Sequence, residues 1–189
     1  VNTHCYDHTV GKNFWKKRIF NDIGAALYNL NFAFIKNTLR RYKEFKSFFS
    51  QKFNTLHIET IKKNSIKKII EREKLTDQIF FKIDIEGSEY RILDELIKYE
   101  NKICALIIEF HDVDLHIEKI SNFINKFKLD LTHTHPNNYG GVSENNIPLV
   151  LECTFENNPE KIIDKLQLPN NCDQPNNPLN KDINLFFEN

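Results

Sequence analysis

The sequence predicts an α/β fold, with a doubly wound, mostly parallel sheet whose final strand runs antiparallel. Strand-like and helix-like segments alternate along the chain, which is typical of parallel strands joined by crossover helices. The last two strand candidates are joined by a loop too short for a crossover helix, so we expect them to pair antiparallel. The chain of 189 residues is 40% hydrophobic, which suits a globular domain with one core.

The predicted strands are short runs rich in apolar and β-favouring residues, and they cover residues 2–7, 55–61, 78–87, 102–112, 128–136 and 147–156. Helices are predicted where apolar residues recur at steps of three and four, at 14–30, 34–49, 65–74, 88–100, 115–127 and 158–166. Ser65 is the expected N-cap of one helix, and Ser88 opens the next. In the first helix we expect Trp15, Ile19, Ile23, Leu27 and Leu30 to share one face.

This pattern predicts one domain over residues 1–168, with a helical insertion at about residues 12–52. Residues 169–189 are rich in Asn and Pro and are expected to form an irregular tail. Leu185, Phe186 and Phe187 could pack this tail back onto the domain.

The charge of the chain is balanced overall but uneven along its length. Residues 12–52 contain ten Lys or Arg against only Asp22 and Glu44, a local excess of eight positive charges, although the whole chain has a net charge of zero. This segment is either a solvated helical surface or one that attracts an anionic partner. No recognised nucleic-acid-binding module accompanies it, so we expect no nucleic acid partner.

Composition and cysteine usage favour a cytoplasmic protein. No apolar run reaches the roughly 20 residues of a membrane span, and the first ten residues do not form a signal peptide. The four cysteines are widely spaced, without a Cys-x-x-Cys pair, which predicts reduced, structural thiols.

Polar residues stand where the predicted strands end, the edge at which α/β sheets bind ligands. Three strands end in pairs spaced i, i+2, so that both members face one side, and a fourth ends in a single carboxylate. These residues are Asp84 and Glu86, Glu109 and His111, His133 and His135, and Asp7.

Each pair also has a structural explanation. Asp84 and Glu86 could cap the following helix. Glu109 and His111 could form a hydrogen-bonded pair. His133 and His135 could be exposed histidines on an edge strand without a function. A divalent cation held by Asp84 and Glu109 is a further option, but His133 and His135 lack an obvious third ligand. We therefore predict no metal site.

The segment "FKIDIEGSEYRIL", residues 81–93, resembles the "KIDVEG-x-E-x-x-x-L" signature of the FkbM-type methyltransferases. "CYDHT", "LIIEFHD" and the closing "HPNNYGG…IPLVLECTF" resemble other segments of that family, so the similarity runs from about Asn2 to Phe155. The resemblance implies a class I, Rossmann-like methyltransferase fold and S-adenosylmethionine as cofactor. The family's fold opens with a strand and a glycine-rich turn, and no G-x-G precedes Asp7, so we expect an N-terminally truncated domain.

The resemblance also implies roles for individual residues. Asp7 would bind the cofactor ribose, Asp84 its amino acid part, and Glu86 with Gly87 would shape the adjoining turn. Glu109 and His111 would face the methyl acceptor. His111 is the preferred general base because the ordinary pKa of histidine lies near working pH, and Asp84 and then His135 are the next choices.

The function that follows is methylation of an oxygen on a small molecule or saccharide. The basic, aromatic insertion would suit an anionic or lipid-linked acceptor, although aromatic residues at helical spacing are more often packed core. A scaffold or binding module that has lost its cofactor is the alternative, and a nicotinamide-dependent enzyme is a third. The sequence does not specify the acceptor or the oligomeric state.

Overall fold

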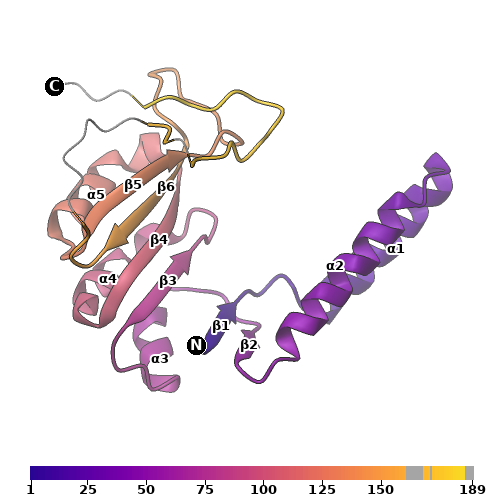
Figure 1. The fold of residues 1–189 in the computed structure, drawn as a ribbon, viewed down its shortest axis with the longest axis horizontal. Coiled ribbons are helices and arrows are strands. Elements are labelled where there is room, and N and C mark those ends of the chain that lie inside the picture. The colour runs from indigo at the N-terminus through magenta and orange to yellow at the C-terminus, as the bar shows by residue number, and fades with distance from the viewer. Residues whose placement is uncertain (161–167, 171, 186–189) are drawn as a thin grey trace. The chain divides into compact units, whose positions relative to one another are not determined.

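The computed structural model describes residues 1–160, 168–170 and 172–185, and these form two compact units, Val1–Ile61 and Lys62–Asn189 (Figure 1). The predicted helix at 158–166 falls almost wholly outside the described residues, as do Phe186 and Phe187. The prediction of a single domain over residues 1–168 remains a prediction.

The first unit is a helical hairpin joined to two short parallel strands. Strand β1 (Thr3–Tyr6) pairs with β2 (Asn54–His57), and the connection between them is made by helices α1 (Lys12–Asn29) and α2 (Ala33–Phe49). Two parallel strands require such a long crossover, because a tight turn can only reverse the chain. The two strands and two helices predicted for this part of the chain are all present.

The buried side of the hairpin differs from the predicted face. Ala26 is fully buried, whereas Ile23, Leu27 and Leu30 are 41, 63 and 85% exposed. Trp15 and Ile19 are half-buried, so the predicted face is covered in the first half of α1 and exposed in the second half. Trp15 obeys the prediction and packs on the rings of Tyr42 and Phe45, with centroid separations of 5.3 and 5.2 Å.

The second unit is built on a four-stranded mixed sheet. Its strands are β3 (Ile79–Ile83), β4 (Ile103–His111), β5 (Asp130–Pro136) and β6 (Val150–Glu156), in the order β3-β4-β6-β5. Only β3 and β4 are parallel; β6 runs antiparallel to both β4 and β5. The antiparallel final strand is thus confirmed, and so is the mixed α/β class. A doubly wound, mostly parallel sheet is not what the described residues form, because β1 and β2 pair in a separate sheet.

Within the described residues, three helices accompany this sheet: α3 (Ser65–Arg72), α4 (Leu93–Lys98) and α5 (Val113–Lys126). The single helix expected from Ser88 is divided into a 3₁₀ turn, Glu89–Arg91, followed by α4 and a second 3₁₀ turn, Glu100–Lys102. Tight i to i+3 bonds hold the first turn, with Arg91 N–H donating to the carbonyl of Ser88.

Aromatic rings form the core where α5 meets the sheet. Phe123 of α5 packs edge-on against Phe155 of β6 at 5.6 Å and against Phe110 of β4 at 6.3 Å. These three side chains are fully or almost fully buried, whereas Phe80 and Lys82 on the opposite face of β3 are exposed. Because successive side chains of a strand point to opposite faces, this asymmetry follows from the sequence of each strand.

None of the described helices combines the length and apolar character that a membrane span requires.

A carboxylate from α4, rather than Ser65, caps α3. Glu95 is buried and accepts hydrogen bonds from the backbone N–H of Asn64 and from that of Lys67 at 3.1 Å. We expect Glu95→Ala to lower the free energy of unfolding by about 2 kcal/mol, since it leaves two helix-terminal donors unpaired. Urea unfolding measures this loss. Asp94→Ala, at an exposed carboxylate of the same helix, should change stability by less than about 0.5 kcal/mol, and equal losses in both variants would contradict the capping role.

Candidate active site

The first part of the site is the turn that follows β3. Ser88 N–H donates to the carbonyl of Ile85 at 3.2 Å, and the two residues between them, Glu86 and Gly87, have φ angles of 54° and 86°. Two successive positive φ values are characteristic of a type I′ turn. Glycine adopts this conformation without cost, whereas Glu86 is strained in it. The turn places the Asp84 and Glu86 carboxylates at the exposed end of β3.

The Glu89 side chain holds this turn by accepting hydrogen bonds from its backbone. It is fully buried, and its Oε1 accepts hydrogen bonds from the backbone N–H of Ile85 at 3.0 Å and of Gly87 at 3.2 Å. The same oxygen lies 3.2 Å from Nδ1 of His111. Its second oxygen, Oε2, is buried and makes no hydrogen bond with the part of the chain that the structure describes. A buried carboxylate needs such donors, because an unpaired buried charge is very costly.

His111 ends β4 and lies among three carboxylates. Its Nδ1 faces Glu89, while Nε2 is 3.5 Å from Oε2 of Glu86 and 4.0 Å from Oδ1 of Asp84. When Nδ1 carries its proton toward Glu89, Nε2 of the neutral ring is left with a free lone pair. The 4.0 Å separation from Asp84 is too long for a direct hydrogen bond. A carboxylate thus faces each of the two ring nitrogens of His111.

Tyr90 forms a hydrogen bond with the backbone of His111. Its hydroxyl donates to the carbonyl oxygen of His111 at 2.6 Å. Burial, and then the negative charges of Glu89 and Asp112, raise the pKa of Tyr90 well above its ordinary value, so the hydroxyl keeps its proton and remains a donor. Asp112, directly after His111, has a φ of 51°, so both loops that carry the site contain a strained non-glycine residue.

Glu109 lies on the same side of β4 as His111 but has a different partner. Its Oε1 accepts a hydrogen bond from Nδ2 of Asn137 at 2.7 Å, which ties it to the loop after β5. The structural pair that the sequence suggested between Glu109 and His111 is replaced by this contact and by the pairing of His111 with Glu89.

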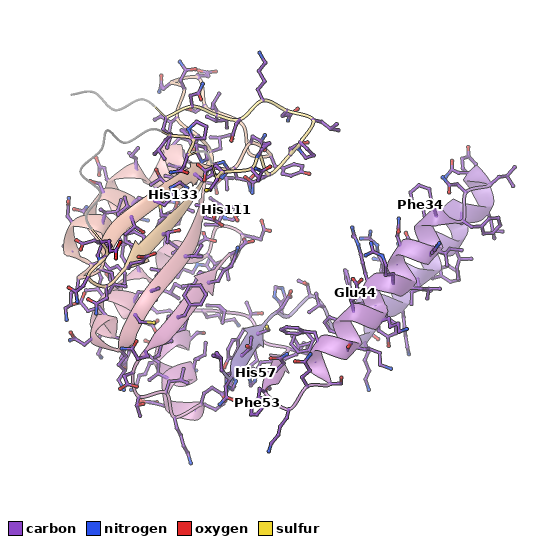
Figure 2. All side chains as sticks on the ribbon, viewed as in Figure 1. Phe34, Glu44, Phe53, His57, His111 and His133 are labelled. Atoms are coloured by element: carbon purple, nitrogen blue, oxygen red, sulfur yellow. The ribbon has the colours of Figure 1, made fainter. Side chains whose placement is uncertain are left out.

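The two histidines of β5 are paired with the C-terminal tail. Nε2 of His133 is 2.9 Å from Asp173, and Nε2 of His135, which is buried, is 3.2 Å from Asp182. Figure 2 labels His111, at the end of β4, and His133, within β5, both on the four-stranded sheet. These tail carboxylates explain both β5 histidines structurally, and His135 is the weakest of the predicted bases.

Asp7 belongs to the first unit, Val1–Ile61, and its hydrogen bonds lie within that unit. Its Oδ1 accepts hydrogen bonds from both the backbone N–H and the hydroxyl of Thr9, each at 2.6 Å. The carboxylate therefore closes a local turn after β1.

One group of side chains that could hold a divalent cation is Asp84, Glu86 and His111, whose ligand atoms all lie within 4.8 Å of one another. Carboxylate oxygens with one imidazole nitrogen are a donor set that several divalent metals accept. The same three side chains can also interact directly with one another, as an imidazole ring beside two carboxylates. Their geometry therefore does not require a metal ion. The two carboxylates equally suit the cationic amino group of an amino acid ligand.

Two of the site's residues, Glu89 and Tyr90, were not among those predicted from the sequence. Both stand in the segment that carries the family resemblance. Glu89 had one detectable signal: it occupies the helical apolar stripe that continues through Ile92, Leu93 and Leu96, where a carboxylate is unexpected.

A comparison with protein-family models agrees with the family resemblance of residues 81–93. The model of the methyltransferase FkbM domain matches residues 21–137, a range that holds the second half of α1, all of α2, the β3 turn and all of β4. No curated protein and no solved structure matches the chain. Because the family model covers more than half of the 189 residues, the chain belongs to the FkbM methyltransferase family.

Proposed function

We propose that the chain uses S-adenosylmethionine to methylate a hydroxyl of a small molecule or saccharide, with His111 as general base. The observation that carries this proposal is the Glu89–His111 pair. A fully buried carboxylate faces Nδ1 at 3.2 Å, and Nε2 is directed toward the carboxylates at the end of the sheet. A base oriented in this way is what removal of a proton from an acceptor hydroxyl requires.

The chain's own residues would contribute orientation and proton transfer. When bound, S-adenosylmethionine supplies the methyl group on a positively charged sulfur. His111 Nε2 would take the acceptor proton while the acceptor oxygen attacks the methyl carbon in line with the carbon–sulfur bond, whose electrons remain on sulfur. Glu89 would stabilise the imidazolium that forms, together with the Glu86 carboxylate 3.5 Å from Nε2.

The cofactor residues that we propose are Asp84, Glu86, Gly87 and Asp7. The Asp84 and Glu86 carboxylates suit the cofactor's amino group, since both are exposed at the strand end. Gly87 permits the positive φ of the turn, and Asp7 would accept from the ribose. We propose that no metal takes part, so turnover should persist in EDTA.

The alternative is a binding or scaffold module without turnover. One observation favours it: Oδ1 of Asp7 already accepts two hydrogen bonds from Thr9, so a ribose would have to use the other oxygen or displace them. The location we propose is the cytoplasm, because all four cysteines are free thiols.

Thermal unfolding with S-adenosylmethionine, its demethylated product or NAD tests the cofactor. At 100 times the Kd, a ligand stabilises the folded state by about 2.7 kcal/mol, which corresponds to a Tm increase of roughly 5–10 °C for a chain of this size. We expect this increase with the first two ligands and none with NAD. Asp84→Asn should reduce it, whereas Asp77→Asn, at an exposed carboxylate before β3, should not. The same increase with NAD, or none with any ligand, would contradict the proposal.

A further inference from the structure

The end of the α1–α2 hairpin exposes large apolar side chains. We call the hairpin tip the set Leu27, Tyr28, Leu30, Phe32 and Phe34, whose side chains are between 46 and 89% exposed. Figure 2 labels Phe34 toward the turn between the helices and Glu44 nearer the other end of α2. Single exposed apolar residues are common, but five within eight positions form a patch of the kind that marks an interaction surface.

The charges beside the hairpin tip are all positive. No acidic residue occurs between Asp22 and Glu44, whereas the first half of α2 and its centre carry exposed cations at Lys36, Arg40, Arg41 and Lys43. Both carboxylates have partners on the hairpin's own helices, and the Glu44 side chain is 60% exposed. Asp22 accepts a hydrogen bond from Thr38 and lies 3.5 Å from Arg18, and Glu44 lies 3.2 Å from Arg40.

Two asparagines that lie between the residues of the hairpin tip make hydrogen bonds to the backbone of the hairpin itself. Asn29 donates to the carbonyl of Ala25 at 2.9 Å, and the Asn31 side-chain oxygen accepts from the N–H of Ala33 at 3.0 Å. The tip therefore presents aromatic and aliphatic surface with cations behind it, and little that would make directional hydrogen bonds with a partner.

We propose that the hairpin tip docks on the surface of an anionic lipid bilayer. Its aromatic and aliphatic side chains would enter the interfacial layer, and the cations of α2 would face the lipid headgroups. A second copy of the chain is a poorer occupant, because it would bring another excess of positive charge against the same surface. The proposal concerns the hairpin alone and does not depend on the methyl transfer proposed above.

Vesicle sedimentation with the whole chain tests the proposal. Vesicles of phosphatidylcholine with 30% phosphatidylserine should carry down most of the protein at low salt, and pure phosphatidylcholine vesicles should carry down at least fivefold less. Raising the salt to 0.5 M should release the bound protein, since exposed charges are then screened. Equal binding to both vesicle types would overturn the charge-based part, and no binding to either would overturn the proposal.

Two variants separate the apolar and charged contributions. Tyr28→Ser/Leu30→Asn/Phe32→Ser removes apolar surface at exposed positions and should abolish sedimentation; asparagine suits position 30, where φ is 50°. Lys36→Gln/Arg41→Gln should remove only the preference for phosphatidylserine. Circular dichroism should show an unchanged helical content in both variants.

The matched control is Leu115→Ser/Tyr139→Ser/Leu179→Ser, which removes comparably exposed apolar side chains, 68–92% exposed, from the other unit. This variant should sediment like the unmodified chain. Loss of binding in the control as strong as in the tip variant would overturn the assignment to the hairpin. A tip variant that keeps binding vesicles, or that only dissociates an oligomer seen by light scattering, would also overturn it.

Discussion

His111→Ala is expected to lower methyl transfer by about 10²–10⁴-fold, the usual contribution of a positioned general base. The physical reason is that we propose Nε2 of His111, on the side of the ring away from the Nδ1–Glu89 contact at 3.2 Å, as the group that takes the acceptor proton. Transfer of radiolabelled methyl groups from S-adenosylmethionine into an extract of saccharides and lipid-linked saccharides, in EDTA, measures the loss.

Cofactor affinity should be nearly unchanged in this variant, because the proposed cofactor contacts come from the turn after β3. The thermal shift with the demethylated product is the check. His133→Ala is the matched control: this histidine is on β5, paired with Asp173 at 2.9 Å, and its loss should leave turnover within about twofold. Turnover of His111→Ala at the level of this control would remove His111 from the mechanism.

Replacing Glu89 is expected to affect both folding and turnover. Glu89→Ala would leave two part-buried backbone donors, the N–H groups of Ile85 and Gly87, without their acceptor. A buried donor left unpaired costs about 1–3 kcal/mol, and for these two part-buried donors the free energy of unfolding should fall by about 2 kcal/mol in total. Urea unfolding measures this, with Glu71→Ala, an exposed carboxylate on α3, as a control that should change stability by less than about 0.5 kcal/mol.

Glu89→Gln separates the positioning role from the structural one. The amide oxygen can still accept from the turn, so stability should fall by no more than about 1 kcal/mol. The charge that stabilises protonated His111 is lost, however, and kcat should fall by about 100-fold with little change in the KM for S-adenosylmethionine. A kcat equal to that of the unmodified chain would show that Glu89 only supports the turn.

Much of the local structure was predictable from the sequence, because it depends on neighbouring residues. Apolar runs predicted all six described strands, and spacings of three and four predicted the hairpin helices as well as α3 and α5. The i, i+2 spacing of Asp84 and Glu86, placed after an apolar strand, predicted a polar strand end. The structure brings this end to within 4.0 Å of His111.

Other features depend on contacts between segments far apart in the chain. The tail residues Asp173 and Asp182 pair with His133 and His135 from 40 and 47 positions away, which no local pattern indicates. The exposure of α1 was also not evident from its periodicity, since Ala26 is buried while Leu27 and Leu30 of the predicted face are exposed.

By itself, the sequence determined the order of strands and helices, the family signature at residues 81–93 and the polar ends of the strands, since these follow from side-chain periodicity and from residues adjacent in the chain. The tertiary structure alone decided which groups meet: Glu89 with His111, Glu109 with Asn137, and the strands in two separate sheets. The physical reason is that a buried carboxylate takes whichever donors the packed chain brings within reach, and packing is settled by the whole unit rather than by any one segment.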